Sequence, residues 1–181
     1  MKFLFSTLLF CILVSASLAD DGKRVTKDEF SNATACFHAE PLTEKGRVAA
    51  GLIVEFAEQS HEIEITIASS LVPWIGIKDN TNADYRSLLL GAYVAGNAKS
   101  QITKGVKADD PYSGMLFVFA VYEKMKIETK GFKIAEIENF IKLEKRKQLK
   151  EHLENNLKNE KRAEENERKN LKFQSCSFQH A

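Results

Sequence analysis

The sequence predicts a mainly α-helical fold, a small bundle of three to four helices with one short strand and a charged helical extension at the C-terminus. Three observations predict it. Apolar residues recur at helical spacing over most of residues 41–141, whereas residues 61–68 alternate strictly between polar and apolar. From residue 142 onward, Lys, Glu, Arg, Asn and Gln dominate the composition. No repeat of fixed period is visible, which disfavours a solenoid.

The first nineteen residues have the pattern of a secretory signal peptide. Lys2 supplies a positive start, residues 3–14 are almost unbroken apolar, and Ser17 and Ala19 place small residues where a signal peptidase would cut. A retained membrane anchor is the alternative, but it requires about 20 predominantly apolar residues. We therefore expect residues 1–19 to be removed on export, and the remaining chain to work in the periplasm or the extracellular space.

Residues 20–40 are polar and have no sustained period, which predicts a flexible arm with one short helical turn over residues 32–38. Asn32 begins an Asn-Ala-Thr triplet that matches the N-glycosylation pattern and matters only in a eukaryotic host. Cys36 and Cys176 remain after export, and in an oxidising compartment they allow one disulfide. Two free or intermolecular thiols are the equal alternative.

The helical domain, residues 41–141, is expected to begin with a helix capped by Thr43. The expected apolar face of this helix consists of Val48, Leu52, Ile53 and Phe56. Residues 61–68 then alternate polar side chains with isoleucines, which indicates a strand. Because an isolated strand leaves its backbone groups unpaired, this strand needs a partner.

Two further helices have clear start signals. One begins at Thr81 or Asn82 and carries small residues, Gly96 among them, that let a second helix approach closely. The next begins with Asp110 as its N-cap and Pro111 in the first helical position. Its side chains are apolar on nearly every face, so we expect it to be the central and most buried element.

The last part of the chain is expected to leave the globular body. A fourth helix opens after Gly131 and covers residues 132–141. Residues 142–181 then form a charged tail, in which leucines every four residues and opposite charges four apart favour a helix that ends in disorder.

Composition and motifs argue against several kinds of chemistry. A formal net charge of +1 disfavours a broadly basic nucleic-acid binder. His61 and Glu62 resemble the start of a zinc-protease motif, but Ile65 stands where the second histidine is needed. The sequence contains no nucleophile elbow and no glycine-rich phosphate loop. We therefore expect no catalytic residues, no metal and no cofactor, and no transmembrane segment after export.

The sequence thus favours an exported, non-catalytic binding protein that acts through protein–protein interaction, in the manner of an inhibitor or an adaptor. The expected contact patch consists of Trp74, Tyr85 and Tyr112, since large aromatic residues dominate such interfaces; burial of Trp74 at the end of the core is the alternative. Two other functions stay open, an envelope-structural role and an enzyme with dispersed catalytic residues. The polar candidates for that enzyme are Asp109, Asp110, His61 and Glu62.

Overall fold

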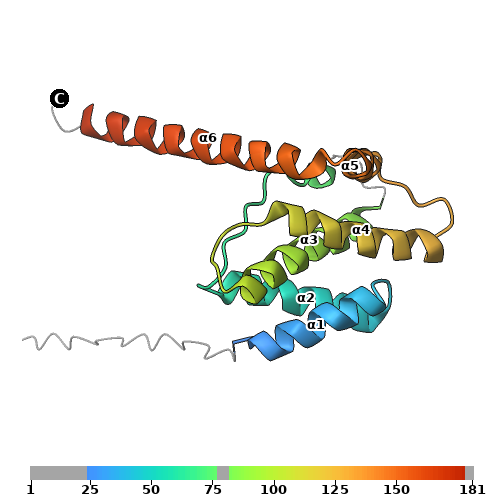
Figure 1. Cartoon of the computed structure of the whole chain (residues 1–181). Helices are drawn as coiled ribbons and strands as arrows, with labels where there is room; N and C mark the ends of the chain where they lie inside the picture. The colour runs from blue at the N-terminus through green and yellow to red at the C-terminus, as the bar shows by residue number, and fades with distance from the viewer. Residues whose placement is uncertain (1–23, 77–81, 178–181) are drawn as a thin grey trace, which may run out of the picture.

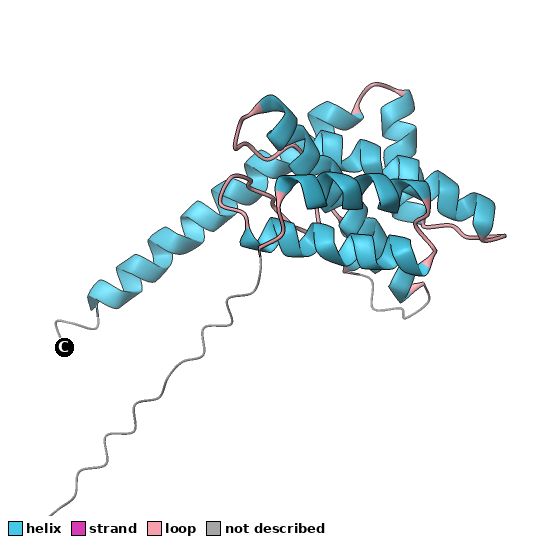
Figure 2. Cartoon of the chain, turned by 90° about the horizontal axis from the view of Figure 1, so that it is seen from below, coloured by secondary structure: helices cyan, strands magenta, loops and turns pink. Residues whose placement is uncertain are grey.

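The computed structural model describes residues 24–76 and 82–177, with side chains as far as Arg168. This part of the chain contains six α-helices, one 3-10 turn and no strand (Figures 1 and 2). The predicted mainly α class is confirmed, but three to four helices are too few. The elements are α1 (Lys27–Ala39), α2 (Glu44–Gln59), η1 (Pro73–Ile75), α3 (Ala83–Lys104), α4 (Pro111–Glu128), α5 (Ala135–Lys145) and α6 (Leu149–Ser177). The predicted leader, residues 1–19, lies outside the described residues.

The flexible arm expected over residues 20–40 is wrong from residue 27 onward, because α1 is a full helix. Thr26 and Glu29 form a reciprocal capping box, in which each side chain accepts a hydrogen bond from the other residue's backbone N–H. Phe30 and Phe37 lie two turns apart on the same face of α1 and are both buried. Phe30 stacks on Phe56 of α2 with ring centroids 4.5 Å apart. The arm is therefore the first helix of the body.

Helix α2 begins as predicted and turns a different face to the core. The Thr43 side chain accepts a hydrogen bond from the Gly46 N–H, which confirms the cap. Ile53 and Phe56 are buried, but Val48 and Leu52 remain 57% and 37% exposed. The buried face is completed instead by Ala49 and Ala50, where α1 and α3 pack against α2.

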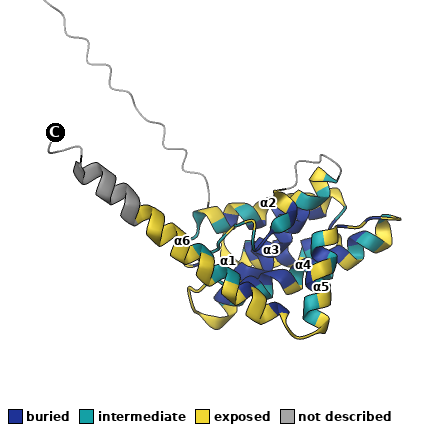
Figure 3. Cartoon of the chain, turned by 90° about the horizontal axis from the view of Figure 1, so that it is seen from above, coloured by how far each residue is buried: buried dark blue, intermediate teal, exposed yellow. Residues whose placement is uncertain are grey.

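Helix α3, and not α4, is the central element. It contacts α2, α4 and η1, and half of its residues are buried (Figure 3). Small residues allow this position: a Cβ atom added at Gly96 would lie 2.5 Å from the Ser113 carbonyl oxygen, and one added at Gly114 would lie 2.9 Å from the Tyr93 ring. The predicted close approach of two helices is confirmed at this crossing.

Residues 63–68 run as an extended loop, as their alternation indicates, but residues 61–62 form a bend and the strand predicted over residues 61–68 does not form. No neighbouring strand exists in the described residues, and side chains bind the backbone instead. The Gln101 side chain accepts from the Glu64 N–H at 2.9 Å and donates to the Glu64 carbonyl oxygen at 2.7 Å. The Thr66 N–H donates to Asp109 at 2.9 Å. Two side chains thus take the place of one neighbouring strand.

The boundary predicted at residue 142 is wrong, because α5 runs through it and the start of α6 belongs to the core. Lys147, with a positive φ of 59°, separates the two helices. Leu149 and Leu153 are completely buried, and Asn156 donates to the Ser70 carbonyl oxygen at 2.9 Å. Further along α6, Glu160 accepts from the Ser70 hydroxyl at 2.6 Å and Lys161 pairs with Glu64 at 2.9 Å. Beyond Lys161, the rest of α6 projects from the body as a charged helix (Figures 1 and 2).

Candidate functional site

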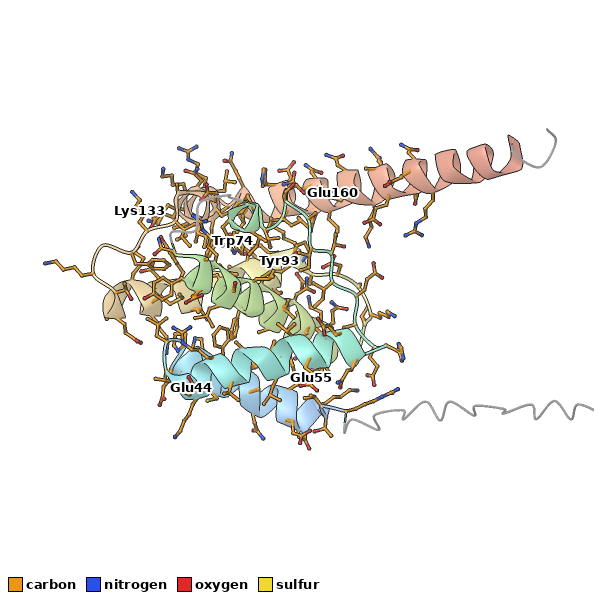
Figure 4. The ribbon with its side chains drawn as sticks, turned by 180° about the vertical axis from the view of Figure 1, so that it is seen from behind. Glu44, Glu55, Trp74, Tyr93, Lys133 and Glu160 are labelled. Atoms are coloured by element: carbon orange, nitrogen blue, oxygen red, sulfur yellow. The ribbon has the colours of Figure 1, made fainter. Side chains whose placement is uncertain are left out.

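The three aromatic residues expected to form a contact patch do not lie together on the surface. Trp74, the middle residue of η1, is fully buried where η1 packs on α3 and α5 (Figure 4), so the alternative of a core role is the correct one. Tyr85 lies at the start of α3 against Phe132, with ring centroids 4.9 Å apart. Tyr112 lies at the start of α4, the other end of this antiparallel helix pair, and donates to Glu144. Trp74, Tyr85 and Tyr112 therefore form no common surface.

Asp110 serves to hold the α3–α4 connection. Its carboxylate accepts from the Ser113 N–H at 3.0 Å, from Ser100 at 2.6 Å and from Lys104 at 2.6 Å. Burial alone would raise the pKa of Asp110. The hydrogen bonds outweigh this effect, that from Lys104 being the strongest of them, and they hold the pKa well below its usual value. The carboxylate is thus ionised and fully engaged with internal donors.

Asp109 is engaged in a second internal network. One of its oxygens accepts from the buried amide of Asn97 at 2.6 Å, and the other accepts from the Thr66 N–H. Asn97 in turn accepts from Gln101 at 2.7 Å and from the Asp110 N–H at 3.0 Å. Buried polar groups that are satisfied in this way fix a structure. The geometry gives Asp109 a structural task, because both of its oxygens hold neighbouring segments.

The remaining polar candidates lie on the surface. His61 is exposed, and its carbonyl oxygen accepts from Lys107. Glu62 pairs with Lys27 at 2.5 Å. Cys36 is partly buried on α1, and the side chain of Cys176 lies outside those described, so the disulfide stays a prediction. In the described parts of the chain, no three His, Cys, Asp or Glu side chains are grouped to hold a metal ion.

The surface feature that stands out is a hollow along one side of α1, α3 and α4, here called the furrow. It consists of two neighbouring depressions of about 510 and 410 Å³ that share Lys99, Thr103 and Phe117. The other lining residues are Lys27, Phe30, Ser31, Thr34, Ala35, His38 and Ile102 in the first depression, and Gly96, Ser100, Lys104, Ser113, Leu116 and Ala120 in the second. Aromatic and aliphatic side chains thus share the lining with cationic ones.

The charge of the furrow has one sign. Its described lining includes three lysines and a histidine and no carboxylate. Lys27 and Lys104 pair with acids outside the lining, whereas Lys99 is exposed and has no ion-pair partner among the described residues. Burial, followed by the charges of Lys124 and Lys99, holds the pKa of His38 below its usual value. Within the described residues, the furrow therefore carries one uncompensated positive charge, that of Lys99, on a chain of nearly zero net charge.

One polar atom inside the furrow lacks a partner. Thr34 is 3% exposed, and its hydroxyl oxygen has no hydrogen-bond partner in the structure. A buried hydroxyl without a partner costs free energy, so native proteins leave few of them. Thr34 lines the larger of the two depressions, one helical turn before His38 on α1, but its hydroxyl oxygen is itself buried.

Sequence reasoning missed the furrow residues Phe30, Thr34, Lys99 and Phe117. The available signal was the capping box of Thr26, followed by apolar residues at helical spacing, which would have placed α1 against the body.

No protein-family model, curated protein or solved structure matches this chain. Within the described residues, none of the helices combines the length and apolar character needed to cross a bilayer.

Proposed function

We propose that this chain is a non-catalytic binding protein, acting outside the cytosol, that holds a segment of another protein in the furrow. The observation that carries the proposal is the combination of an open apolar lining with an unpaired cation. Leu116 is 39% exposed and Phe117 is partly exposed beside it, while Lys99 has no acidic partner among the residues that the structure describes. Exposed apolar surface with polar groups at its edge is typical of interaction sites.

The charge of the furrow indicates the chemistry of the partner segment. Apolar side chains fit against Phe30, Leu116 and Phe117, and a carboxylate beside them would meet Lys99. We therefore infer that the partner presents an acidic amphipathic segment, such as a helix with Leu and Phe on one face and Glu along its border.

Fluorescence anisotropy tests this proposal with two synthetic amphipathic helical peptides that share their apolar face. One carries Glu and the other Lys along the border. We expect the acidic peptide to bind more tightly, and Lys99→Glu to weaken its binding about tenfold, because one favourable charge contact becomes repulsive. The control Lys158→Glu makes the same charge change on exposed α6, outside the furrow, and should leave the affinity within about twofold. Equal affinities for both peptides, or no effect of Lys99→Glu, would refute the proposal.

A further inference from the structure

The extended segment over residues 63–67 uses one of its two hydrogen-bonding edges. Glu64 and Thr66 direct their backbone groups inward: both groups of Glu64 bond to Gln101, and the Thr66 N–H donates to Asp109. The Thr66 carbonyl oxygen accepts from the Tyr93 hydroxyl at 3.5 Å. In an extended chain, successive residues direct their N–H and C=O groups to opposite edges. The even-numbered residues therefore bind the body.

The opposite edge is unpaired. The backbone N–H and C=O groups of Ile63, Ile65 and Ile67 form no hydrogen bond within the described residues. Ile67 is 48% exposed, so the edge reaches the surface at that end. Native proteins usually cover, charge or interrupt such edges, because an unpaired edge is a template for another strand. The outer edge of residues 63–67 is thus unpaired, open to solvent at Ile67 and largely covered at Ile63, which is 6% exposed.

We propose that this edge pairs with the same edge of a second copy of the chain, antiparallel and centred on Ile65. In this register, Ile65 faces its counterpart and Ile63 faces Ile67 of the other copy. All three pairs are of the hydrogen-bonded type, and each exchanges two bonds, which gives about six in total. The same surface serves both copies, as a two-fold interface requires.

The side chains of residues 63–67 favour pairing with a second copy of the chain. The antiparallel register sets Glu64 opposite Thr66, so no carboxylate faces another carboxylate, and it sets isoleucine opposite isoleucine. A parallel, in-register pairing would place Glu64 beside Glu64 of the other copy, where like charges are destabilising. The edge shares no residue with the furrow, so this inference is independent of the proposed function.

Sedimentation equilibrium of the chain from Asp20 onward, which keeps every described residue, tests the proposal. A reducing agent excludes dimers linked through cysteine. Because two strands alone are marginally stable, we expect a monomer–dimer equilibrium between about 10 µM and 1 mM. Ile67→Pro should leave a monomer over this range. The substitution removes an N–H that has no partner among the described residues, and the extended backbone of Thr66 is the conformation that a residue before proline prefers. Ile67→Val keeps the N–H and should still dimerise.

Backbone hydrogen exchange supplies a second measurement that needs no variant. Exchange of the Ile63, Ile65 and Ile67 amides should slow as the concentration rises, whereas exchange of the Glu64 and Thr66 amides should not change, since these are bonded within each copy. A wild type that stays monomeric, an Ile67→Pro variant that dimerises as the wild type does, or outer amides whose exchange is independent of concentration would each overturn the proposal. If Ile67→Pro does not fold, the exchange experiment decides.

Discussion

The close crossing of α3 and α4 predicts that two glycine-to-alanine substitutions, Gly96→Ala and Gly51→Ala, change the stability of this protein in opposite directions. A Cβ atom added at Gly96 would meet the Ser113 carbonyl oxygen at 2.5 Å and the Phe117 Cβ at 2.6 Å. Nonbonded carbon atoms pack best at about 3.5–4.0 Å, so the helices must separate by roughly 1 Å. Gly51 provides the matched control, because it also lies inside a helix and an added Cβ there has no atom within 4 Å.

The two substitutions should change the free energy of unfolding in opposite directions. Alanine in place of glycine inside a helix contributes about 1 kcal/mol, and this is the whole effect expected for Gly51→Ala. Overpacking costs about 1–3 kcal/mol, and contacts with a backbone atom and a Cβ place Gly96→Ala at the upper end. The net loss for Gly96→Ala is therefore about 2 kcal/mol, and the two variants should differ by about 3 kcal/mol.

Urea denaturation followed by circular dichroism measures this difference. Thermal melting gives an independent value, since about 1 kcal/mol shifts the Tm of a domain of this size by roughly 2–4 °C. We expect a higher Tm for Gly51→Ala and a lower one for Gly96→Ala. If Gly96→Ala is as stable as Gly51→Ala, the approach of α3 and α4 leaves room for a Cβ atom at position 96, and the overpacking argument is wrong.

Two further predictions concern the polar and C-terminal parts of the body. Asp110→Asn should be about 1–2 kcal/mol less stable than wild type at pH 7. Because the folded-state pKa of Asp110 is lowered, this advantage of the wild type is present above about pH 4 and disappears as the pH falls further. Urea titrations of both proteins at several pH values would detect this change. Leu153→Ala should cost about 2–5 kcal/mol because the side chain is fully buried, whereas truncation after Lys161 should leave the Tm nearly unchanged; equal losses would show that the projecting part of α6 also packs on the body.

Signals that act within one turn of chain were predictable from the sequence. Thr43 and Asp110 cap their helices as expected, because the donors that they bind lie three residues ahead. The glycine at position 96, which has no Cβ atom, also indicated a close helix crossing. The capping box at Thr26 belongs to the same class and could have been found, but the polar composition around it favoured a flexible arm.

Features decided by distant residues were not predictable in this way. The alternation in residues 61–68 correctly indicated an extended backbone over residues 63–68, but its hydrogen-bond partners are the Gln101 and Asp109 side chains, tens of residues away. Likewise, the leucines of the tail recur every four residues whether they face solvent or core. Only contacts with the body decide that Leu149 and Leu153 are buried. The pattern gives the local conformation, and the tertiary packing decides the burial.

The two proposed surfaces share a property that allows recognition to be tested separately from folding. The Lys99 ammonium and the outer-edge amide of Ile67 have no partner in the described body, whereas the Asn97 amide is bonded internally. A substitution at Lys99 or Ile67 therefore removes no bond that the folded chain uses, so a change in binding or assembly there reports on recognition. Trp74 differs from both: its indole nitrogen also has no hydrogen-bond partner in the described residues, but the side chain is fully buried and its truncation would disturb the core first. Interaction surfaces in this protein are thus best sought among groups that the fold leaves unpaired.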